Sequence, residues 1–263
     1  MSIDTYPVGL LLVPGCVAAS LVGLAVARRS LHRHDLAKIQ EVASYLFGVV
    51  GTLYAVILGL IVVDSMSKFS EARLTVEAEA NAISDIVLFA SQLPGETPRR
   101  VREHAEEYVK SVTEVEWPLM ADRKISPETQ KAAVAFSVAL LAFEPKTERE
   151  QEIFAGQLEA ASQFWNGRRI RVAAAGRDGL PPLEWFVLIV GGLITVIYTF
   201  FFKPDDFRLQ LAITGMLSAV IALNLYLILM FASPFSGDVK IHPQSFESAR
   251  HTMEAVSGNR AGG

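Results

Sequence analysis

Cysteine is nearly absent from this sequence, in which Cys16 is the single one among 263 residues. Within one chain, a disulfide framework and a zinc site built from cysteine thiolates are therefore excluded. An excess of positive charge is lacking too, because 28 acidic residues outnumber 24 Lys and Arg and the formal net charge is -4. Nucleic acid attracts basic patches, so we expect no nucleic-acid partner.

Motifs of catalytic sites are missing as well. The sequence shows no pattern typical of nucleophilic catalysis, of a phosphate-binding loop or of a zinc protease. We therefore expect neither an enzyme nor a bound metal or other cofactor.

Four uncharged apolar runs dominate what is present. Hydrophobic residues make up 51% of the chain, and its mean hydropathy is +0.33. The runs cover residues 6–27, 42–63, 185–202 and 209–231. Each is close to the roughly 17 to 25 residues that a helix needs to cross the hydrocarbon of a bilayer. The sequence therefore predicts an all-α integral membrane protein with four transmembrane helices.

The first run has a second interpretation as a secretory signal peptide, because Ala25-Val26-Ala27 resembles a cleavage site. No basic residue precedes this run, however, and it is long for the apolar core of a signal. We interpret it as a transmembrane helix. Four spans place both chain ends on one side of the membrane. Lys and Arg flank the spans almost equally on the two sides, so charge does not decide the orientation.

The region between the second and third runs has helical character. Apolar residues recur there at steps of three and four, which place them on one helical stripe: Phe69, Ala72, Val76, Ala80, Ile83, Val87 and Ala90. No Gly or Pro separates this stripe from the second run, so we expect one helix from Glu41 to about Leu93, roughly 75 to 80 Å long. Further helices are expected to begin at Thr97, Ser126 and Thr147, which are good capping residues.

The predicted organisation follows this alternation of apolar and charged regions. Residues 1–63 form a first transmembrane pair, 64–180 a helical polar domain, 181–233 a second transmembrane pair, and 234–263 a C-terminal loop, short helix and disordered tail. The long helix cannot bury all its faces in one small bundle, and copies arranged about an axis would cover it. We therefore expect a homo-oligomer.

Two kinds of residue line the second run on opposite faces. Val49, Leu53 and Ile57 are bulky and apolar, and they either contact lipid or form a hydrophobic constriction that gates by dewetting. Small residues on the other face permit close approach of a neighbouring helix, or alternatively form a pore wall. These small residues are Ser44, Gly48, Gly51, Ala55 and Gly59.

Polar residues near the spans offer further candidates. Asp64 follows the second run as an interfacial charge. Asn224 lies within the fourth run, where a polar side chain hydrogen-bonds a neighbouring helix or serves a conduction pathway. Arg168, Arg169 and Arg171 fit an anion or lipid-headgroup site, but we favour a solvated face or pairs with Glu.

Two motifs resemble stretches of the bestrophins, a family of pentameric anion channels. Phe69-x-Glu71-Ala72-Arg73 lies just beyond the second run, as an aromatic-Glu-Ala-Arg stretch does in bacterial bestrophins. Directly after the fourth run comes Pro234-Phe235-Ser236-Gly237-Asp238. It resembles a Pro-Phe-Gly stretch followed by acidic residues in bestrophins. As a whole the chain resembles the bestrophin-like family of bacterial membrane proteins. The features that carry this resemblance are Gly51-x-Leu53-Tyr54-Ala55, Glu116-Trp117-Pro118, Arg168-Arg169-x-Arg171 and Pro234-Phe235-x-Gly237-Asp238.

The resemblance implies five chains around a pore that is lined by the second helix. In bestrophins a ring of bulky apolar residues forms a neck about four turns before the Glu-Ala-Arg motif, and that count reaches Ile57, Leu53 and Val49 here. The resemblance also implies a bacterial inner membrane, with the termini and the polar domain in the cytoplasm. Membrane lipid and small inorganic ions would be the partners. Charged residues expected at the inner mouth of the pore are Asp64, Glu71 and Arg73.

The sequence departs from bestrophins in two ways that bear on function. Asp238 stands alone where animal bestrophins bind calcium through an acidic cluster, so we expect no calcium gating. An Asn-rich stretch is replaced by residues 64–67, which begin with Asp64. Because an acid near a pore mouth favours cations, anion selectivity is not carried over.

The leading hypothesis is therefore a homo-oligomeric, pentameric channel of a bacterial inner membrane with an apolar neck. Its main rival is a non-conducting scaffold or sensor whose helical domain docks a soluble partner. An enzyme acting at the membrane surface comes third, and it requires a buried cleft with convergent Glu and Arg residues.

Overall fold

The structure is a computed structural model that describes residues 5–30, 37–177, 179–202 and 206–261; the side chains of residues 30, 37–44 and 257–261 are not described. The chain divides into two compact units. The membrane unit contains residues 1–69, 178–233 and 237–239, and the polar unit contains residues 70–177, 234–236 and 240–263. Every regular element in the described part of the chain is a helix, as the sequence predicts.

The membrane unit consists of four long helices. They are α1 (Tyr6–Ser30), the first part of α2 (Ala37–Ala90), α7 (Pro182–Tyr198) and α8 (Phe207–Phe231). A short 3-10 turn, η3 (Thr199–Phe201), extends α7. All four helices are long and apolar enough to cross a membrane, which confirms the four predicted spans. The long helix begins four residues earlier and ends three residues earlier than predicted, and it is continuous.

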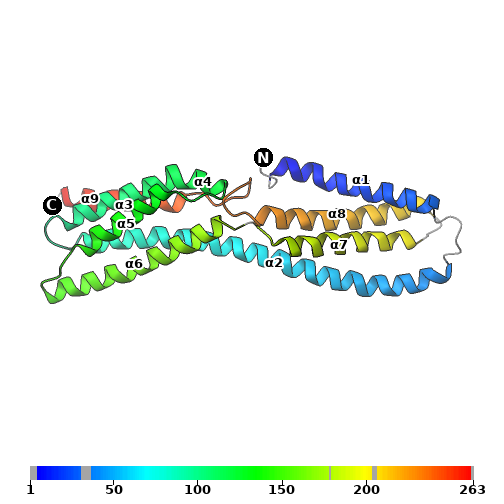
Figure 1. Cartoon of the computed structure of the whole chain (residues 1–263), viewed down its shortest axis with the longest axis horizontal. Helices are drawn as coiled ribbons and strands as arrows, with labels where there is room; N and C mark the ends of the chain where they lie inside the picture. Colours follow the sequence, from blue (N-terminus) through cyan, green and yellow to red (C-terminus); the bar gives the residue numbers. More distant parts are fainter. Residues whose placement is uncertain (1–4, 31–36, 178, 203–205, 262–263) are drawn as a thin grey trace. The chain divides into compact units, whose positions relative to one another are not determined.

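Helix α8 is the centre of the membrane unit, because both α1 and α7 pack against it (Figure 1). A second contact joins α2 to α7 through Tyr54. Its hydroxyl donates a hydrogen bond to the Leu188 carbonyl at 3.0 Å. Its ring occupies the space over Gly191 and Gly192, where an added Cβ would lie 2.6 Å and 3.0 Å from the tyrosine. The two glycines therefore leave the space on α7 into which the Tyr54 side chain packs.

The polar unit contains the remainder of α2 and six further helical segments. These are α3 (Thr97–Ser111), the π-helical turn η2 (Val112–Glu116), α4 (Trp117–Ala121), α5 (Pro127–Leu141), α6 (Glu148–Ala175) and α9 (Gln244–Ala261). Two helix starts follow the predicted capping chemistry. Ser126 accepts a hydrogen bond from the Thr129 N–H, and Thr147 forms a reciprocal capping box with Glu150.

The core of the polar unit joins the second part of α2 to the shorter helices beside it (Figure 1). The predicted α2 stripe is buried at Val76, Ala80 and Ile83. Aromatic rings from three other helices meet within this core, where Phe164 lies 5.1 Å from Tyr108 and 5.4 Å from Phe136, edge to face.

The π-helical turn before α4 is a consequence of Pro118. Proline has no N–H, and its ring crowds the preceding helical turn. The chain widens by one residue there, and the Trp117 N–H bonds the Val112 carbonyl. π-turns of this kind occur frequently at functional sites. The extra residue turns both Glu116 and Trp117 toward the interior, where both are buried.

Candidate functional site

The apolar face of α2 that the sequence singles out lies on the outside of the single chain. Val49, Leu53 and Ile57 are 47%, 61% and 40% exposed. The same stretch of α2 is buried at Tyr54 and Leu58, which face α7 and α8. The bulky residues therefore need a covering from lipid or from another copy of the chain.

The small residues of α2 also lie outside the core. An added Cβ at Gly48, Gly51 or Gly59 would meet no atom within 4 Å. Ala55 is exposed, and the side chain of Ser44 lies outside the described residues. At 3.6 residues per turn, the buried face of α2 lies between the bulky residues and the small residues. The centre of each of these two groups is rotated from the centre of the buried face by roughly a quarter to a third of a turn, in opposite directions. The close packing that the small residues predict is therefore not made among the residues that the structure describes.

Two of the three charges expected at the pore mouth form ion pairs along α2. Asp64 forms an ion pair with Lys68 at 2.6 Å, and both side chains are about half exposed. Arg73 pairs with Glu77 at 3.2 Å, and Glu71 is exposed. The Lys68 ammonium offsets the Asp64 charge, which weakens the local attraction for cations.

Asn224 makes its hydrogen bond within its own helix. Its side-chain amide donates to the Val220 carbonyl at 2.9 Å. The predicted bond to a neighbouring helix is thus absent from the described contacts of this residue. The amide already has a hydrogen-bond partner. A role in ion conduction is therefore not needed to explain a polar residue in this apolar span.

A network of buried charged groups lies in the polar unit. Arg168 donates from its two Nη atoms to the two carboxylate oxygens of Glu116, at 2.9 Å and 3.1 Å. Arg171 donates in the same bidentate way to Glu79, at 2.7 Å and 3.0 Å. It also reaches Glu116 at 2.9 Å, which links the two pairs. Such forked arrangements give geometric specificity as well as strength.

Neutral side chains complete this network. The Tyr108 hydroxyl donates to Glu79 and accepts from Arg168 at 3.0 Å. Gln130 accepts from Arg168 at 3.2 Å and 3.3 Å. We refer to Glu79, Tyr108, Glu116, Arg168 and Arg171 as the charge network; all five side chains are at most 2% exposed.

The burial of the charge network decides what it can do. Its two arginines and two glutamates balance formally, and no substrate can reach groups that are fully covered. The convergence of Glu and Arg that an enzyme would need is present, but it lies in packed protein rather than in a cleft. The pairs with Glu that we favoured for Arg168 and Arg171 are observed, and Arg169 is exposed.

The C-terminal segment covers one side of the charge network with aromatic rings. The Arg171 guanidinium carbon lies 5.8 Å from the Trp117 ring centre and 5.6 Å from that of Phe246. Trp117 also contacts Phe235 edge to face at 5.6 Å, and its indole N–H donates to the Ile241 carbonyl at 3.3 Å. The Glu116-Trp117, Arg171 and Pro-Phe motifs are therefore parts of one core.

Gly167 allows α6 to approach α2 closely enough for these bonds. An added Cβ at Gly167 would lie 2.9 Å from the Glu79 Cβ and 3.1 Å from its Cα. That contact is with backbone and cannot be relieved by rotating a side chain. Any larger residue must push α6 away from Glu79 and stretch the forked bond from Arg171.

The pKa values of the charge network are displaced by burial and by charge. Burial alone would raise the pKa of Glu116, but the hydrogen bonds and positive charges of Arg168 and Arg171 hold it below its ordinary value. Burial and the negative charge of Glu79 raise the pKa of Tyr108, so its hydroxyl keeps its proton. Burial alone would lower the pKa of Arg171, but the negative charge of Glu79 and its hydrogen bond raise it well above the ordinary value.

The lowered pKa of Glu116 predicts a loss of stability in acid. A carboxyl whose pKa is depressed by folding stabilises the native state above its unfolded pKa of about 4.3, and this contribution disappears as pH falls through the folded value. We expect the thermal midpoint of the polar unit to fall steeply below about pH 4. In Glu116→Gln this fall should be shallower, as followed by tryptophan fluorescence. An equally steep fall in Glu116→Gln would show that other carboxyls control it.

Asp238 stabilises the first helix of the membrane unit. Its carboxylate accepts a hydrogen bond from the backbone N–H of Tyr6, the first residue of α1. A negative charge at a helix N-terminus is favourable because the free N–H groups there are partly positive. Gly237 precedes it at φ +75°, a conformation that glycine adopts without strain. The Gly-Asp end of the motif therefore has a structural role in this chain.

Sequence reasoning missed several members of the charge network and of the residues around it. Glu79 lies between Val76 and Ala80 on a stripe that was treated as wholly apolar, and an acid at such a place was the available signal. Tyr108, Gln130 and the covering ring of Phe246 had no such signal, because only the folded chain brings them to the arginines.

Comparisons with known proteins give concordant results. The sequence model of the Bestrophin-like domain matches residues 15–246. A comparison with curated proteins finds no match.

Solved structures share the fold at low sequence identity. One is a mutant of a bacterial bestrophin homologue from Klebsiella pneumoniae, with a TM-score of 0.69 and 14% identity over 94% of this chain and 99% of that chain. Another mutant of that homologue has a TM-score of 0.68 and 14% identity over 95% and 98%. A further structure, described as a membrane protein, has a TM-score of 0.70 and 13% identity over 94% and 98%.

Proposed function

This chain belongs to the Bestrophin-like domain family, and from that premise we propose that copies of it assemble around an ion-conducting pore lined by α2. Five is the expected number of copies. The apolar neck of the pore is formed by Val49, Leu53 and Ile57. The membrane is a bacterial inner membrane, with the termini and the polar unit in the cytoplasm.

The observation that carries this proposal is the division of α2 into three faces. One face is buried against α7 and α8, while the bulky flank and the small flank are uncovered in the single chain. In a ring of like helices, each α2 has a neighbour on both sides. Small residues let those neighbours approach closely, and bulky apolar residues can then narrow the central passage.

A second uncovered apolar surface supports self-association. Val134, Val138 and Leu141 lie one turn apart on α5 and are all exposed. The polar unit is rich in charge, so a contiguous apolar strip on it suggests contact with another protein surface. A second copy of the chain is the proposed partner for this strip. The same strip would also suit the alternative function, a non-conducting scaffold that docks a soluble protein.

The experiment that tests the proposal joins assembly to current. We expect the full chain, purified in detergent, to have the mass of a closed homo-oligomer and to carry ion currents after reconstitution into planar bilayers. The reversal potential of the current, measured with a salt gradient across the bilayer, shows whether cations or anions are favoured. Correctly assembled protein that carries no current would favour the scaffold, and a monomer would end the channel proposal.

A further inference from the structure

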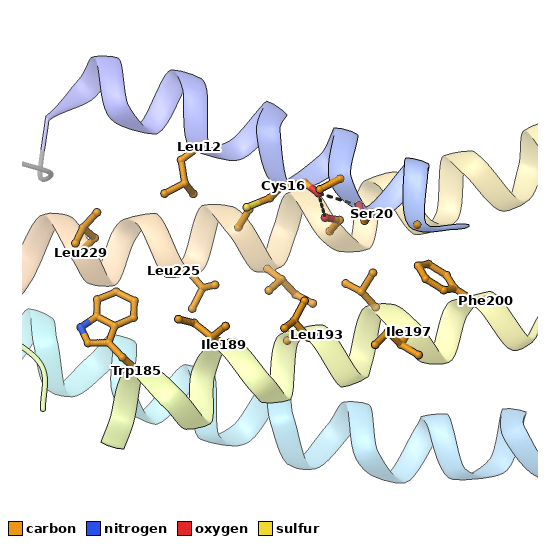
Figure 2. A pocket seen from close by; sticks show the side chains of 17 residues that line it. Leu12, Cys16, Ser20, Trp185, Ile189, Leu193, Ile197, Phe200, Leu225 and Leu229 are labelled. Carbon is orange, nitrogen blue, oxygen red and sulfur yellow. Dashed lines mark hydrogen bonds between the residues drawn. The ribbon is translucent and has the colours of Figure 1, made fainter. Parts of the chain in front are cut away.

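A groove in the membrane unit has the shape and chemistry of a lipid site. Helices α1 and α7 both pack on α8 but diverge from one another, so α8 forms the floor between two walls (Figure 2). The space holds about 650 Å³. Leu12 and Cys16 belong to the α1 wall, and Ile189, Leu193 and Ile197 to the α7 wall (Figure 2).

Two serine hydroxyls line the groove, one on α1 and one on α8, and both are already hydrogen-bonded. Ser20 donates to carbonyl oxygens of its own helix at 2.8 Å and 3.0 Å. Ser218 donates to the Cys16 carbonyl at 3.3 Å. With these hydroxyls already bonded to backbone, the surface of the groove is in effect hydrocarbon. A polar ligand would lose its bonds to water there, whereas an acyl chain would lose nothing.

The two ends of the groove differ. Trp185 lies at one end and Phe200 at the other (Figure 2). From Trp185 to Phe200 the helix rises about 22 Å, which exceeds half of the roughly 30 Å hydrocarbon core. A single extended acyl chain therefore matches the length of the groove.

Positive charge follows the Phe200 end. The Phe200 ring lies beside Gly23 of α1, and Arg28 and Arg29 come in the next turns of that helix. Arg28 is held in place by a 3.1 Å hydrogen bond to Gln210 and by its position 4.5 Å above the Phe207 ring.

An open hollow at this end leaves room for a headgroup. It is lined by Ala25, Arg28, Arg29 and Phe207, and Arg29 is exposed. Two neighbouring arginines at the end of a transmembrane helix attract the negatively charged phosphate of an anionic lipid. Guanidinium groups suit this ligand because they match phosphate oxygens in pairs.

We propose that an anionic phospholipid binds here, with one acyl chain in the groove between α1 and α7 and its phosphate at Arg28 and Arg29. The bound lipid fills the space that the divergence of α1 from α7 leaves open. This site does not depend on conduction, so it stands or falls separately from the channel.

The test uses Trp185 as a reporter in the full purified chain. Phosphatidylglycerol brominated along its acyl chain is added in a zwitterionic detergent, and quenching of fluorescence is followed to saturation. Trp185→Phe gives the background from the two tryptophans of the polar unit. We expect Ala19→Phe, which fills the groove, to weaken apparent binding about tenfold or more. The matched control is Ala18→Phe, because Ala18 is also exposed on α1 but does not line the groove.

The charge end is tested with the same assay. Arg29→Gln should lower the preference for the anionic lipid over a zwitterionic one about fivefold. Arg208→Gln, which removes an exposed charge at the start of α8 outside both hollows, should leave that preference unchanged. Bromine near the chain end should quench Trp185 more than bromine near the headgroup.

Three outcomes would overturn the proposal. Equal binding by Ala19→Phe and Ala18→Phe would show that the lipid lies elsewhere on the protein surface. Stronger quenching by bromine near the headgroup would place the phosphate at the Trp185 end. A short bifunctional maleimide can link Cys16 of one copy to Cys16 of another copy. Efficient linking both in protein stripped of lipid and in protein saturated with lipid would show that another copy covers the groove.

Discussion

Replacing Ile57 by alanine is expected to raise the ion current of the reconstituted protein severalfold. Ile57 belongs to the exposed bulky flank of α2, and a ring of such side chains narrows the proposed pore. A narrow apolar passage conducts poorly because water leaves it readily and an ion must then shed its hydration. Truncation widens the passage and favours its wetting. Single-channel recording in planar bilayers measures the change directly.

A matched substitution separates the neck from a general effect on the membrane unit. Ile194 on α7 is 43% exposed, close to the 40% of Ile57, and it lies outside the proposed pore. Ile194→Ala should leave the current unchanged. Leu53→Asn keeps the branching and the number of side-chain heavy atoms but removes the apolar surface. A larger increase in Leu53→Asn than in the still smaller Leu53→Ala would therefore identify dewetting rather than steric blockage as the barrier.

A third substitution tests the orientation of α2. Val56 lies between the two uncovered flanks, on the side opposite the buried face. Should Val56→Ala raise the current while Ile57→Ala and Leu53→Asn do not, the neck lies on this middle face, and the bulky flank packs instead against the small residues of the next copy. No effect from any of the three in a conducting wild type would move the barrier away from this stretch of α2.

The helices of this protein are predictable because the causes that produce them are local. Length and hydropathy alone determine whether a segment can cross a bilayer, so the four spans follow from composition. Ser126 and Thr147 cap the helices that they were expected to start. The helix that begins at Thr97 continues past Pro118 to Ala121, because a π-turn absorbs the missing N–H.

The charge network was less predictable because its causes are not local. Arg168 and Arg171 were recognised as a motif, and pairing with Glu was foreseen, but the sequence does not say which of many glutamates pairs with which arginine. Glu79 lies far from Arg171 in the sequence, and the forked bond forms only because Gly167 lets two helices touch. The uncovered flanks of α2 show the same limit at the next level, since the partners that we propose for them belong to other copies of the chain.

Removing the charge of Arg171 should destabilise the polar unit more than any other single change in the charge network. Arg171 bonds both glutamates, and Arg171→Met would leave Glu79 buried without its positive partner. Breaking a buried ion pair in this way costs about 3 to 5 kcal/mol. Denaturant unfolding, followed by the fluorescence of Trp117 and Trp165 in the full chain, measures the loss. Arg169→Met, which removes an exposed charge two residues away, should change stability by less than about 0.5 kcal/mol.

A double variant keeps this prediction testable even if Arg171→Met does not fold. Glu79→Gln combined with Arg171→Met removes the unpaired carboxylate, so the double variant should recover a large part of the lost stability. Buried ion pairs can often be replaced by neutral side chains at little cost, whereas half of a pair cannot be left behind. If the double variant is instead as unstable as Arg171→Met, the loss comes from the packing of the guanidinium between Trp117 and Phe246 rather than from the stranded charge of Glu79.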